Sequence, residues 1–334
     1  MAPPINQASA KTKSHQSAAI ASGPKHSLLL IQGDIDPAWA EQSLSASNAL
    51  LRPPLGLEFK AQTELIAHKM MLAVSPADDT KSLCLSLATR EGLDVNVLNL
   101  QRRWQDFGMM AFDMDSTLIN IECLDEMAAY AGCGEQVAAI TEAAMRGEIA
   151  DYDESLRQRV QLLKGQSPEL MQRLIREKLR LQPGVARLAD CARQKNIKIV
   201  VLSGGFHPIV DVVAQMIGAD ACRANRLSVS DGMLDGGLIG SILNAQAKAR
   251  FVDAFLLQWG LERQQSIAVG DGANDLAMMA IAGLSACYRA KPVVAAQAAL
   301  SFRALGLDAL LEHFEETRHP CLQQAIGQLE GVQR

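Results

Sequence analysis

Three short apolar segments, each followed directly by a polar cluster, constrain the fold of this chain more than any other feature. In chain order, the segments and their clusters are 109–112 with 113–117, 197–202 with 203–205, and 266–269 with 270–275. Continuous apolar runs of this length are typical of strands buried on both faces of a parallel sheet. Because helix-like stretches separate them, the pattern predicts a doubly wound α/β sheet of the Rossmann type, whose ligands lie beyond the carboxyl ends of the strands.

The first two segments are about 80 residues apart, which is far more than one crossover helix needs. The last helical pattern in this stretch has Ser167 as its N-cap residue and Pro168 at its first helical position. We therefore expect a helical cap inserted at about 120–183 into a catalytic domain of 106–325. The expected cap helices are 124–131, 134–146, 153–163 and 168–181.

The residues before the first segment predict a second, smaller domain. Residues 1–25 are rich in Ala, Ser, Pro, Gln and Lys, and we expect a disordered tail there. Elements then follow in the order β-α-β-β-α-β over 26–102, which predicts a small α+β sandwich of the ferredoxin-like kind. The expected strands are 27–31, 57–61, 66–74 and 95–98, and the expected helices are 37–51 and 78–91.

The composition of the chain excludes several classes of protein. With 32 basic and 37 acidic side chains the formal charge is -5, and aromatic residues make up 4%, so no nucleic-acid partner is expected. No apolar run approaches the roughly 18 residues of a membrane span. The seven cysteines are scattered without a C-x-x-C pair, which argues against a zinc site or a disulfide framework and favours a reducing, cytoplasmic location.

The polar cluster at 113–117 suits phosphoryl chemistry. Asp113 and Asp115 are two residues apart at a strand end, so both carboxylates can face one site, where a cation or a proton must relieve their repulsion. Mg²⁺ prefers oxygen ligands, and Asp271 is the natural third carboxylate, with Asp275 close to it. A lone D-x-D pair is often a surface turn, but aspartates at the end of a second strand favour a metal site.

The second cluster, Ser-Gly-Gly at 203–205, ends an apolar strand and precedes a helical stretch at 208–217. It offers a hydroxyl group, backbone N–H groups and a helix N-terminus, all suited to a phosphate or another oxyanion, although Ser-Gly-Gly is also a common turn. Lys248 opens a later helix and, taken alone, is best interpreted as a solvated surface lysine. His207 is interpreted as a packing or capping residue.

Several other phosphate-binding and hydrolytic motifs are missing from the sequence. It has no G-x-x-x-x-G-K-[ST] loop, no complete dinucleotide fingerprint and no G-x-S-x-G elbow. The order D-x-D-S-T, S-G-G, a lone lysine and G-D-G-x-N-D instead resembles the haloacid dehalogenase (HAD) superfamily of phosphohydrolases, and within it the phosphoserine phosphatases. The resemblance extends over about 106–300 and is carried by the stretches 113–122, 144–148, 155–160, 203–206 and 270–275.

This resemblance implies roles for the residues of these motifs. Asp113 is the expected nucleophile, which forms an aspartyl-phosphate, and Asp115 is the expected general acid and base. The expected cofactor is Mg²⁺, held by Asp113, the Asp115 carbonyl and Asp271, with Asp275 supporting these ligands. The expected ligands of the phosphoryl group are Ser203, Gly204, Lys248 and Asn274.

The substrate implied by the resemblance is O-phospho-L-serine, and its recognition falls to the cap. Its ammonium and carboxylate groups need one anion and one bidentate cation, and the resemblance gives these roles to Glu122 and Arg159. Met145 and an aromatic residue, Tyr152, would line an apolar wall. The stretch 147–153 is one residue longer than the common pattern and has tyrosine where phenylalanine is usual. From the residues alone, Glu122 and Arg159 could instead form an ion pair on a helix surface.

The motifs leave other functions open. A relative with the same nucleophile could act on phosphothreonine or phosphohomoserine, or transfer the phosphoryl group to an acceptor alcohol. Residues 26–100 are also similar to ACT-like domains, which bind small amino acids at paired interfaces. This region could therefore be a serine-binding regulatory module, or it could pair two chains in a homodimer. The leading expectation is a Mg²⁺-dependent phosphatase that completes L-serine synthesis.

Overall fold

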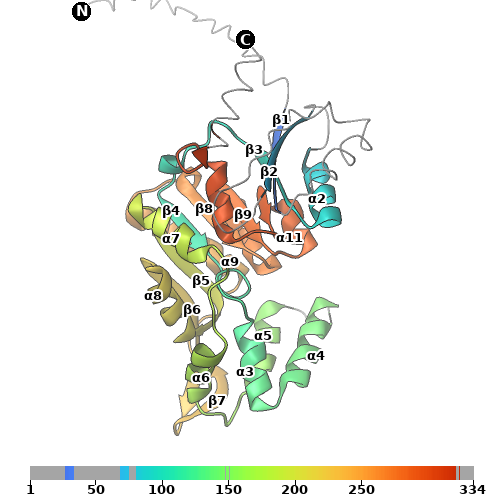
Figure 1. Ribbon diagram of the computed structural model, residues 1–334. Coiled ribbons are helices and arrows are strands. Elements are labelled where there is room, and N and C mark those ends of the chain that lie inside the picture. The colour runs from blue at the N-terminus through green and yellow to red at the C-terminus, as the bar shows by residue number, and fades with distance from the viewer. Residues whose placement is uncertain are drawn as a thin grey trace, which may run out of the picture.

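The computed structural model describes residues 27–33, 68–74, 80–146, 148–149, 151–320 and 323. At its centre is a seven-stranded sheet in the order β10-β9-β8-β4-β5-β6-β7 (Figure 1). Neighbouring strands are parallel, apart from β6 and β7, which form an antiparallel hairpin at one edge. The strands are β4 (Met109–Phe112), β5 (Lys198–His207), β6 (Ala221–Ser230), β7 (Met233–Leu238), β8 (Ser266–Gly270), β9 (Leu284–Tyr288) and β10 (Leu300–Phe302).

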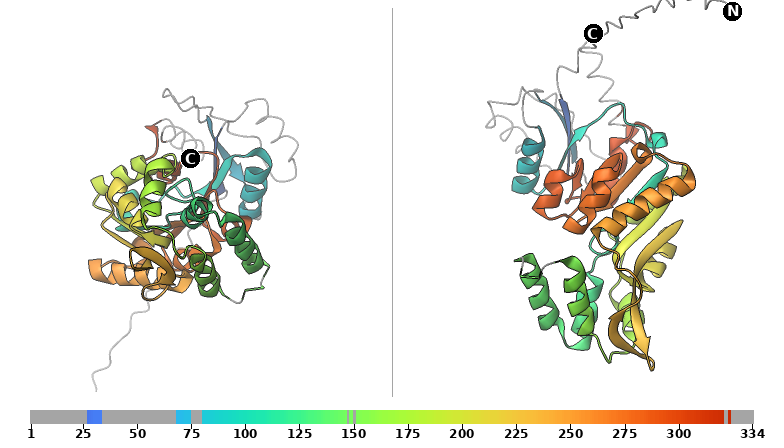
Figure 2. Two further views of the ribbon diagram at one scale, coloured as in Figure 1. Left: turned by 90° about the horizontal axis from the view of Figure 1, so that it is seen from below. Right: turned by 180° about the vertical axis from the view of Figure 1, so that it is seen from behind.

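Two groups of helices accompany this sheet. One group covers its faces, and the other, α3 to α6, follows β4 and forms the cap (Figures 1 and 2). The first group is α7 (Val185–Gln194), α8 (Ile209–Ile217), α9 (Ala245–Trp259), α10 (Leu276–Ile281) and α11 (Pro292–Gln297), with 3₁₀ turns η1 (Trp104–Asp106), η2 (Arg263–Gln265), η3 (Ala273–Asp275) and η4 (Leu307–His313). The cap helices are α3 (Cys123–Ala131), α4 (Gly134–Met145), α5 (Tyr152–Gln161) and α6 (Glu169–Glu177). None of the described helices has both the length and the apolar character needed to cross a bilayer.

The side chains of β4 alternate between the two faces of the sheet, and helices cover both faces. Met110 and Phe112 belong to the core that also contains α7 and α8. Met109 and Ala111 belong to the core on the other side, with α9 and α10. This burial on both faces explains the continuous apolar run of β4, and the predicted doubly wound α/β sheet is confirmed.

The order of the strands brings the three polar clusters of the sequence together. β4 pairs in parallel with both β8 and β5, so the carboxyl ends of the three strands meet at one edge of the sheet. Asp113 follows β4, Asp271 follows β8, and Ser203 lies on β5. The residues on which the fold prediction rested are therefore neighbours in space.

The Ser-Gly-Gly cluster at 203–205 differs from its prediction in the position where its strand ends. The Ser-Gly-Gly run at 203–205 does not end the strand, because β5 continues to His207, and α8 begins only at Ile209. The strand continues because its last residues pair with Asn225 and Arg226 of β6 after an irregularity in the register. The helical stretch expected at 208–217 is confirmed as α8 (Ile209–Ile217), which begins two residues after the end of the strand.

The predicted cap helices are present, with two differences. The last cap helix, α6, starts at Glu169, and the N–H of Glu169 donates to Ser167 Oγ at 3.2 Å. The helix ends at Glu177 instead of at the predicted residue 181. It ends there because Leu181 pairs with Ile119 in an isolated β-bridge. The β6–β7 hairpin, which was not predicted, packs against α5 and so adds a second chain segment to the cap.

The described part of the N-terminal domain is a three-stranded antiparallel sheet and one helix. β1 lies between β2 and β3, an order that agrees with the predicted ferredoxin-like sandwich, whereas the ACT-like assignment stays a prediction. Its elements are β1 (Ser27–Gly33), β2 (His68–Val74), α2 (Thr80–Glu91) and β3 (Asp94–Leu98). The predictions that lie outside the described residues are the tail 1–25, the helix 37–51 and the strand 57–61.

Candidate active site

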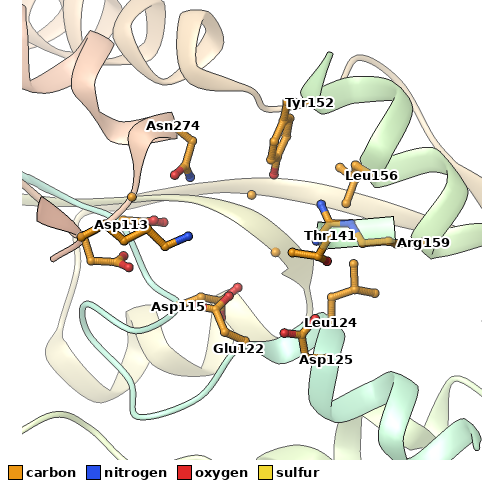
Figure 3. Close-up of a pocket in the computed structure, with 15 residues that line it drawn as sticks. Asp113, Asp115, Glu122, Leu124, Asp125, Thr141, Tyr152, Leu156, Arg159 and Asn274 are labelled. Carbon is orange, nitrogen blue, oxygen red and sulfur yellow. The ribbon is translucent and has the colours of Figure 1, made fainter. Parts of the chain in front are cut away.

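A cavity of about 380 Å³ lies between the cap and the carboxyl ends of β4, β5 and β8. Figure 3 shows Asp113 and Asn274 on its sheet side and Arg159, Leu156 and Thr141 on its cap side. The lining thus joins carboxylates of the sheet to charged and apolar groups of the cap. Its residues are Asp113, Asp115, Glu122, Leu124, Asp125, Thr141, Tyr152, Leu156, Arg159, Gly204, Gly205, Asp271, Gly272, Asn274 and Lys291.

Lys248 supplies a buried cation directly behind this lining. Its side chain is fully buried, and its Nζ lies 2.8 Å from Asp113 Oδ1 and 2.7 Å from Asp275 Oδ1. Burial alone would lower the pKa of Lys248, but the two carboxylates more than offset this effect and raise it. Burial and Asp275 raise the pKa of Asp113, whereas Lys248 acts in the opposite direction. The interpretation of Lys248 as a solvated surface lysine was therefore wrong.

Three carboxylates gather beside this lysine. Asp113, Asp271 and Asp275 each offer an oxygen within 4.8 Å of the others. Burial raises the pKa of Asp271 to about 6, and the charges of Asp275 and Glu122 add to the rise. When all three carboxylates are ionised, the single ammonium of Lys248 leaves an excess of two negative charges. A divalent cation with a preference for oxygen ligands would balance this excess, so the donor set fits Mg²⁺.

Asp275 holds the loop after β8 in place. Its Oδ2 accepts the backbone N–H groups of Asp271 and Gly272 at 3.1 and 3.0 Å. A Cβ on Gly270 would lie 2.4 Å from the Asp275 carboxyl group, so only glycine leaves room for it. Thr117 Oγ1 donates to Asp271 Oδ1 at 3.0 Å and orients that carboxylate from the β4 side.

Asp115 differs from Asp113 in its surroundings. Burial raises the pKa of Asp115 to about 7, and the nearby Glu122 carboxylate adds to the rise. Among the described residues, Asp115 Oδ1 has no hydrogen-bond partner. A carboxyl group with such a pKa can hold a proton near neutral pH and can also release it, as a general acid and base must.

Strand β5 forms a polar wall of the cavity. Ser203 is fully buried, and its Oγ accepts the N–H of Gly205 at 2.9 Å. Asn225 of β6 donates to the Gly204 carbonyl at 2.8 Å and thereby fixes the backbone of this wall. Tyr152 reaches it from the cap, because a Cβ on Gly204 would lie only 2.4 Å from Tyr152 Oη.

The cap contributes two acidic groups, Glu122 and Asp125, and one basic group, Arg159, to the cavity. Glu122 Oε1 accepts a hydrogen bond from Ser116 Oγ at 2.6 Å, and Arg159 Nε donates to the Ser155 carbonyl at 3.3 Å. The ion pairs within the described part of the chain do not include one between Glu122 and Arg159. The alternative of a pair on a helix surface was therefore wrong, and both side chains line the cavity.

The residues named from the sequence meet at this one site. The members that line the cavity are Asp113, Asp115, Glu122, Tyr152, Arg159, Gly204, Asp271 and Asn274. The members that are buried behind its lining are Ser203, Lys248 and Asp275. The Met145 side chain lies outside the described part of the structure.

Sequence reasoning missed several residues of the site. Asp125 and Thr141 line the cavity from α3 and α4, and Asn225 supports Gly204 from β6. Asp125 could have been found, because it stands one helical turn after Glu122. Lys291, which also lines the cavity, stands alone before a proline and gives no such signal.

Comparison with known proteins agrees with this geometry. The family model of the haloacid dehalogenase-like hydrolases matches residues 110–280. A phosphoserine phosphatase of a Polaromonas species is 49% identical over 225 residues, which cover 66% of this chain and 95% of that protein. The unliganded structure of a probable phosphoserine phosphatase from Vibrio cholerae has a TM-score of 0.70 at 30% identity, over 89% of this chain and 88% of that one. A phospho-aspartyl intermediate analogue of phosphoserine phosphatase has a TM-score of 0.58 at 34% identity, over 62% of this chain and 99% of that one.

Proposed function

The chain belongs to the haloacid dehalogenase-like hydrolase family, and we propose that it hydrolyses O-phospho-L-serine to L-serine and phosphate, the last step of L-serine biosynthesis. The observation that carries this proposal is one cavity with Asp113 beside the buried Lys248 on one side and Glu122 and Arg159 on the other. Asp113 and Lys248 suit phosphoryl transfer. Glu122 offers a negative charge to the substrate ammonium, and Arg159 offers a positive charge to the substrate carboxylate. The phosphoserine phosphatases among its relatives support the same substrate.

In the proposed reaction Asp113 is the nucleophile. One of its oxygens attacks phosphorus, so that a bond from Asp113 to phosphorus forms and the bond from phosphorus to the serine oxygen breaks. Asp115 gives its proton to the leaving serine oxygen, and L-serine departs as a neutral alcohol. The Asp115 carboxylate then takes a proton from a water molecule, whose oxygen attacks phosphorus, releases phosphate and restores the Asp113 carboxylate.

We propose Mg²⁺ as the cofactor of this reaction. Asp113, Asp271 and the Asp115 carbonyl would hold it, and Asp275 would keep the loop of Asp271 in place. The all-oxygen donor set and the excess of two negative charges support this choice over a softer cation. When bound, the ion would neutralise charge on the phosphoryl group.

The substrate would be held at both ends. Lys248 has three N–H donors, and among the described residues Asp113 and Asp275 take two of them, which leaves one for a phosphoryl oxygen. At the other end, Arg159 would bind the substrate carboxylate and Glu122 its ammonium. The remaining proposed contacts are Ser203, Gly204 and Asn274 to the phosphoryl group, and Met145 and Tyr152 along the apolar wall.

We also propose that the enzyme works in the cytoplasm. Six cysteines of the described residues are free thiols, as expected in a reducing compartment. Pairing of two chains and serine binding through the N-terminal domain are further proposals, which rest on the resemblance to ACT-like domains.

The proposed activity is tested by phosphate release from phosphoserine, phosphothreonine and phosphohomoserine, with and without Mg²⁺ and an acceptor alcohol. We expect preference for phosphoserine, dependence on Mg²⁺, and release of free phosphate in the presence of the alcohol. Asp113→Asn should lose several orders of magnitude in kcat with an unchanged circular dichroism spectrum. Asp253→Asn, at an exposed ion pair with Arg263, should keep wild-type kcat. Preference for a competing substrate, or transfer to the alcohol, would contradict the proposal.

A further inference from the structure

A second cluster of metal-ligating groups lies outside the catalytic cavity, where β5, α8 and β6 meet. His207 Nδ1 lies 2.6 Å from Asp211 Oδ1, and Cys222 Sγ lies 3.5 Å from the same oxygen. All three ligand atoms are within 4.8 Å of one another. A nitrogen, an oxygen and a sulfur donor therefore converge on one point.

The fold fixes these three side chains on three different elements. His207 is the last residue of β5, Asp211 is in the first turn of α8, and Cys222 lies near the start of β6. β5 and β6 are hydrogen-bonded neighbours, and α8 packs on both strands. Since two strands and a helix carry the three donors, the backbone fixes their positions. Small movements of the side chains would then bring the donor atoms into place around one ion.

The cluster is also accessible to an ion from solution. The His207 side chain is 15% exposed and that of Asp211 51%, and Cys222 is partly buried. Zinc bonds of about 2.0–2.3 Å in a tetrahedral arrangement place ligand atoms roughly 3.3–3.6 Å apart. The three atoms would therefore need to shift by roughly an ångström, and a water molecule could take the fourth position.

The donor set selects a borderline cation and not Mg²⁺. Mg²⁺ prefers oxygen ligands, whereas imidazole, thiolate and carboxylate together form a zinc-type set. Without a metal, burial and the hydrogen bond to Asp211 raise the pKa of the Cys222 thiol. Binding would therefore break the S–H bond, form a bond from sulfur to the metal and release the proton to solvent.

We propose that His207, Asp211 and Cys222 form a zinc-binding site that is separate from the oxygen-only catalytic site. A bound ion would join the end of β5, the start of α8 and β6. β5 also carries Gly204, whose carbonyl is held by Asn225 of β6 at 2.8 Å. The ion would therefore stabilise the two strands that form the phosphate-binding wall.

The test uses Co²⁺ as the probe on the full chain, with Mg²⁺ in excess so that the oxygen-only site is filled. A thiolate ligand gives Co²⁺ a charge-transfer absorption band that oxygen ligands do not give. We expect the wild-type protein to bind one Co²⁺ with this band and Zn²⁺ to displace it. Cys222→Ser should lose the band, and absence of the band in the wild type would overturn the proposal.

Two further variants make the test specific. Cys191 is also partly buried but belongs to no cluster of ligands among the described residues, so Cys191→Ser should keep the band and the affinity. Asp211→Asn changes an exposed helix residue, leaves every cysteine in place and should weaken Zn²⁺ binding by at least about 10-fold in calorimetry. A band that survives in Cys222→Ser, or an unchanged affinity in Asp211→Asn, would also overturn the proposal.

Discussion

At the scale of single residues, the two aspartates of the D-x-D pair are chemically different because their neighbours differ. Asp113 Oδ1 lies 2.8 Å from the buried ammonium of Lys248. Among the described residues no cation forms an ion pair with Asp115, and burial raises its pKa to about 7. Identical side chains two positions apart therefore suit different tasks, attack on phosphorus and transfer of a proton.

The environment of Asp115 predicts a pH dependence of kcat/KM. Because its pKa is raised to about 7, the protonated form that serves the leaving group is present below this value and is lost as the pH rises through it. We expect kcat/KM for phosphoserine to fall about tenfold for each pH unit above about 8. Initial rates of phosphate release across this range, with Mg²⁺ saturating, measure the effect.

A nitrophenyl phosphate is the control substrate for this pH profile. Its leaving phenolate is stable without a proton, so the enzyme does not need the acid form of Asp115 for that step. We therefore expect no alkaline fall in kcat/KM for this substrate. An equal fall for both substrates would show that another group titrates, and would contradict the role of Asp115 as the acid.

The places of Asp113 and Asp271 in the cavity could be predicted from the sequence, whereas the environment of Lys248 could not. Asp113 and Asp271 each follow an apolar strand of a parallel sheet, and that position alone directs them to the ligand-binding edge. Lys248 stands alone in its helix, and it is buried only because Asp113 and Asp275 receive its ammonium. Contacts between residues so far apart in the chain leave no local pattern.

At the scale of elements, strand β5 and cap helix α5 meet through Gly204 and Tyr152. α5 begins at Tyr152, and its hydroxyl oxygen occupies the space that a Cβ on Gly204 would need, at 2.4 Å. The ring carbon that carries this hydroxyl group, Tyr152 Cζ, would lie 3.6 Å from the same Cβ, which is an ordinary van der Waals distance. The close approach of cap and sheet at this point therefore depends on a glycine facing a hydroxyl group.

We predict that Gly204→Ala lowers kcat/KM for phosphoserine by roughly 5- to 150-fold, since an overpacked contact costs about 1–3 kcal/mol. The new Cβ would push Tyr152 and the start of α5 away from the cavity. Adding Tyr152→Phe removes the colliding oxygen and should restore most of the loss. Values of kcat/KM for the wild type, both single variants and the double variant measure this coupling.

The neighbouring glycine is the control for this coupling. A Cβ on Gly205 would lie 3.0 Å from Ser203 Oγ and 3.1 Å from Asp115 Oδ2, and Tyr152 is not among its nearest atoms. Tyr152→Phe should therefore not restore the activity of Gly205→Ala. Equal rescue of both alanine variants, or rescue of neither, would argue against the contact between Gly204 and Tyr152.

Burial explains why β4 and β8 could be predicted from the sequence and the β6–β7 hairpin could not. β4 and β8 are buried along their whole length and read as continuous apolar runs. The β6–β7 hairpin has only a few buried positions, with Val229 and Met233 exposed, and its sequence shows no apolar run. The last residues of β5 have the composition of a turn, but pairing with β6 overrides that preference.

At the scale of the whole molecule, polar contacts along β3 attach the N-terminal sheet to the catalytic domain. The buried Asp94 carboxylate accepts the backbone N–H groups of residues 303–305, directly after β10. Asn96 exchanges two hydrogen bonds with the backbone of Ser301, at 2.9 and 2.7 Å. These partners are 205 to 211 residues apart, so no sequence pattern predicted that the two domains would join here.

The catalytic domain also buries an ionisable group that takes no part in the proposed reaction. His313 ends η4, is fully buried, and packs edge-on against Phe302 at a ring distance of 5.6 Å. Among the described residues, neither of its ring nitrogens has a hydrogen-bond partner. Burial, together with the charges of Arg102 and Arg318, lowers the pKa of His313 to about 3, so the folded protein keeps this ring neutral.

We predict that His313 makes the fold sensitive to acid. Its pKa is 6.5 when unfolded and about 3 when folded, so its contribution to stability is complete above 6.5 and is lost as the pH falls towards 3. Between about pH 7 and about pH 5 the free energy of unfolding should fall by about 2 kcal/mol from this group. Urea unfolding measures this effect. In the His313→Leu variant the free energy of unfolding should not show this fall with pH, whereas the His319→Gln variant, changed at an exposed position, should still show it. An unchanged pH dependence in His313→Leu would mean that the ring is not held neutral by the fold.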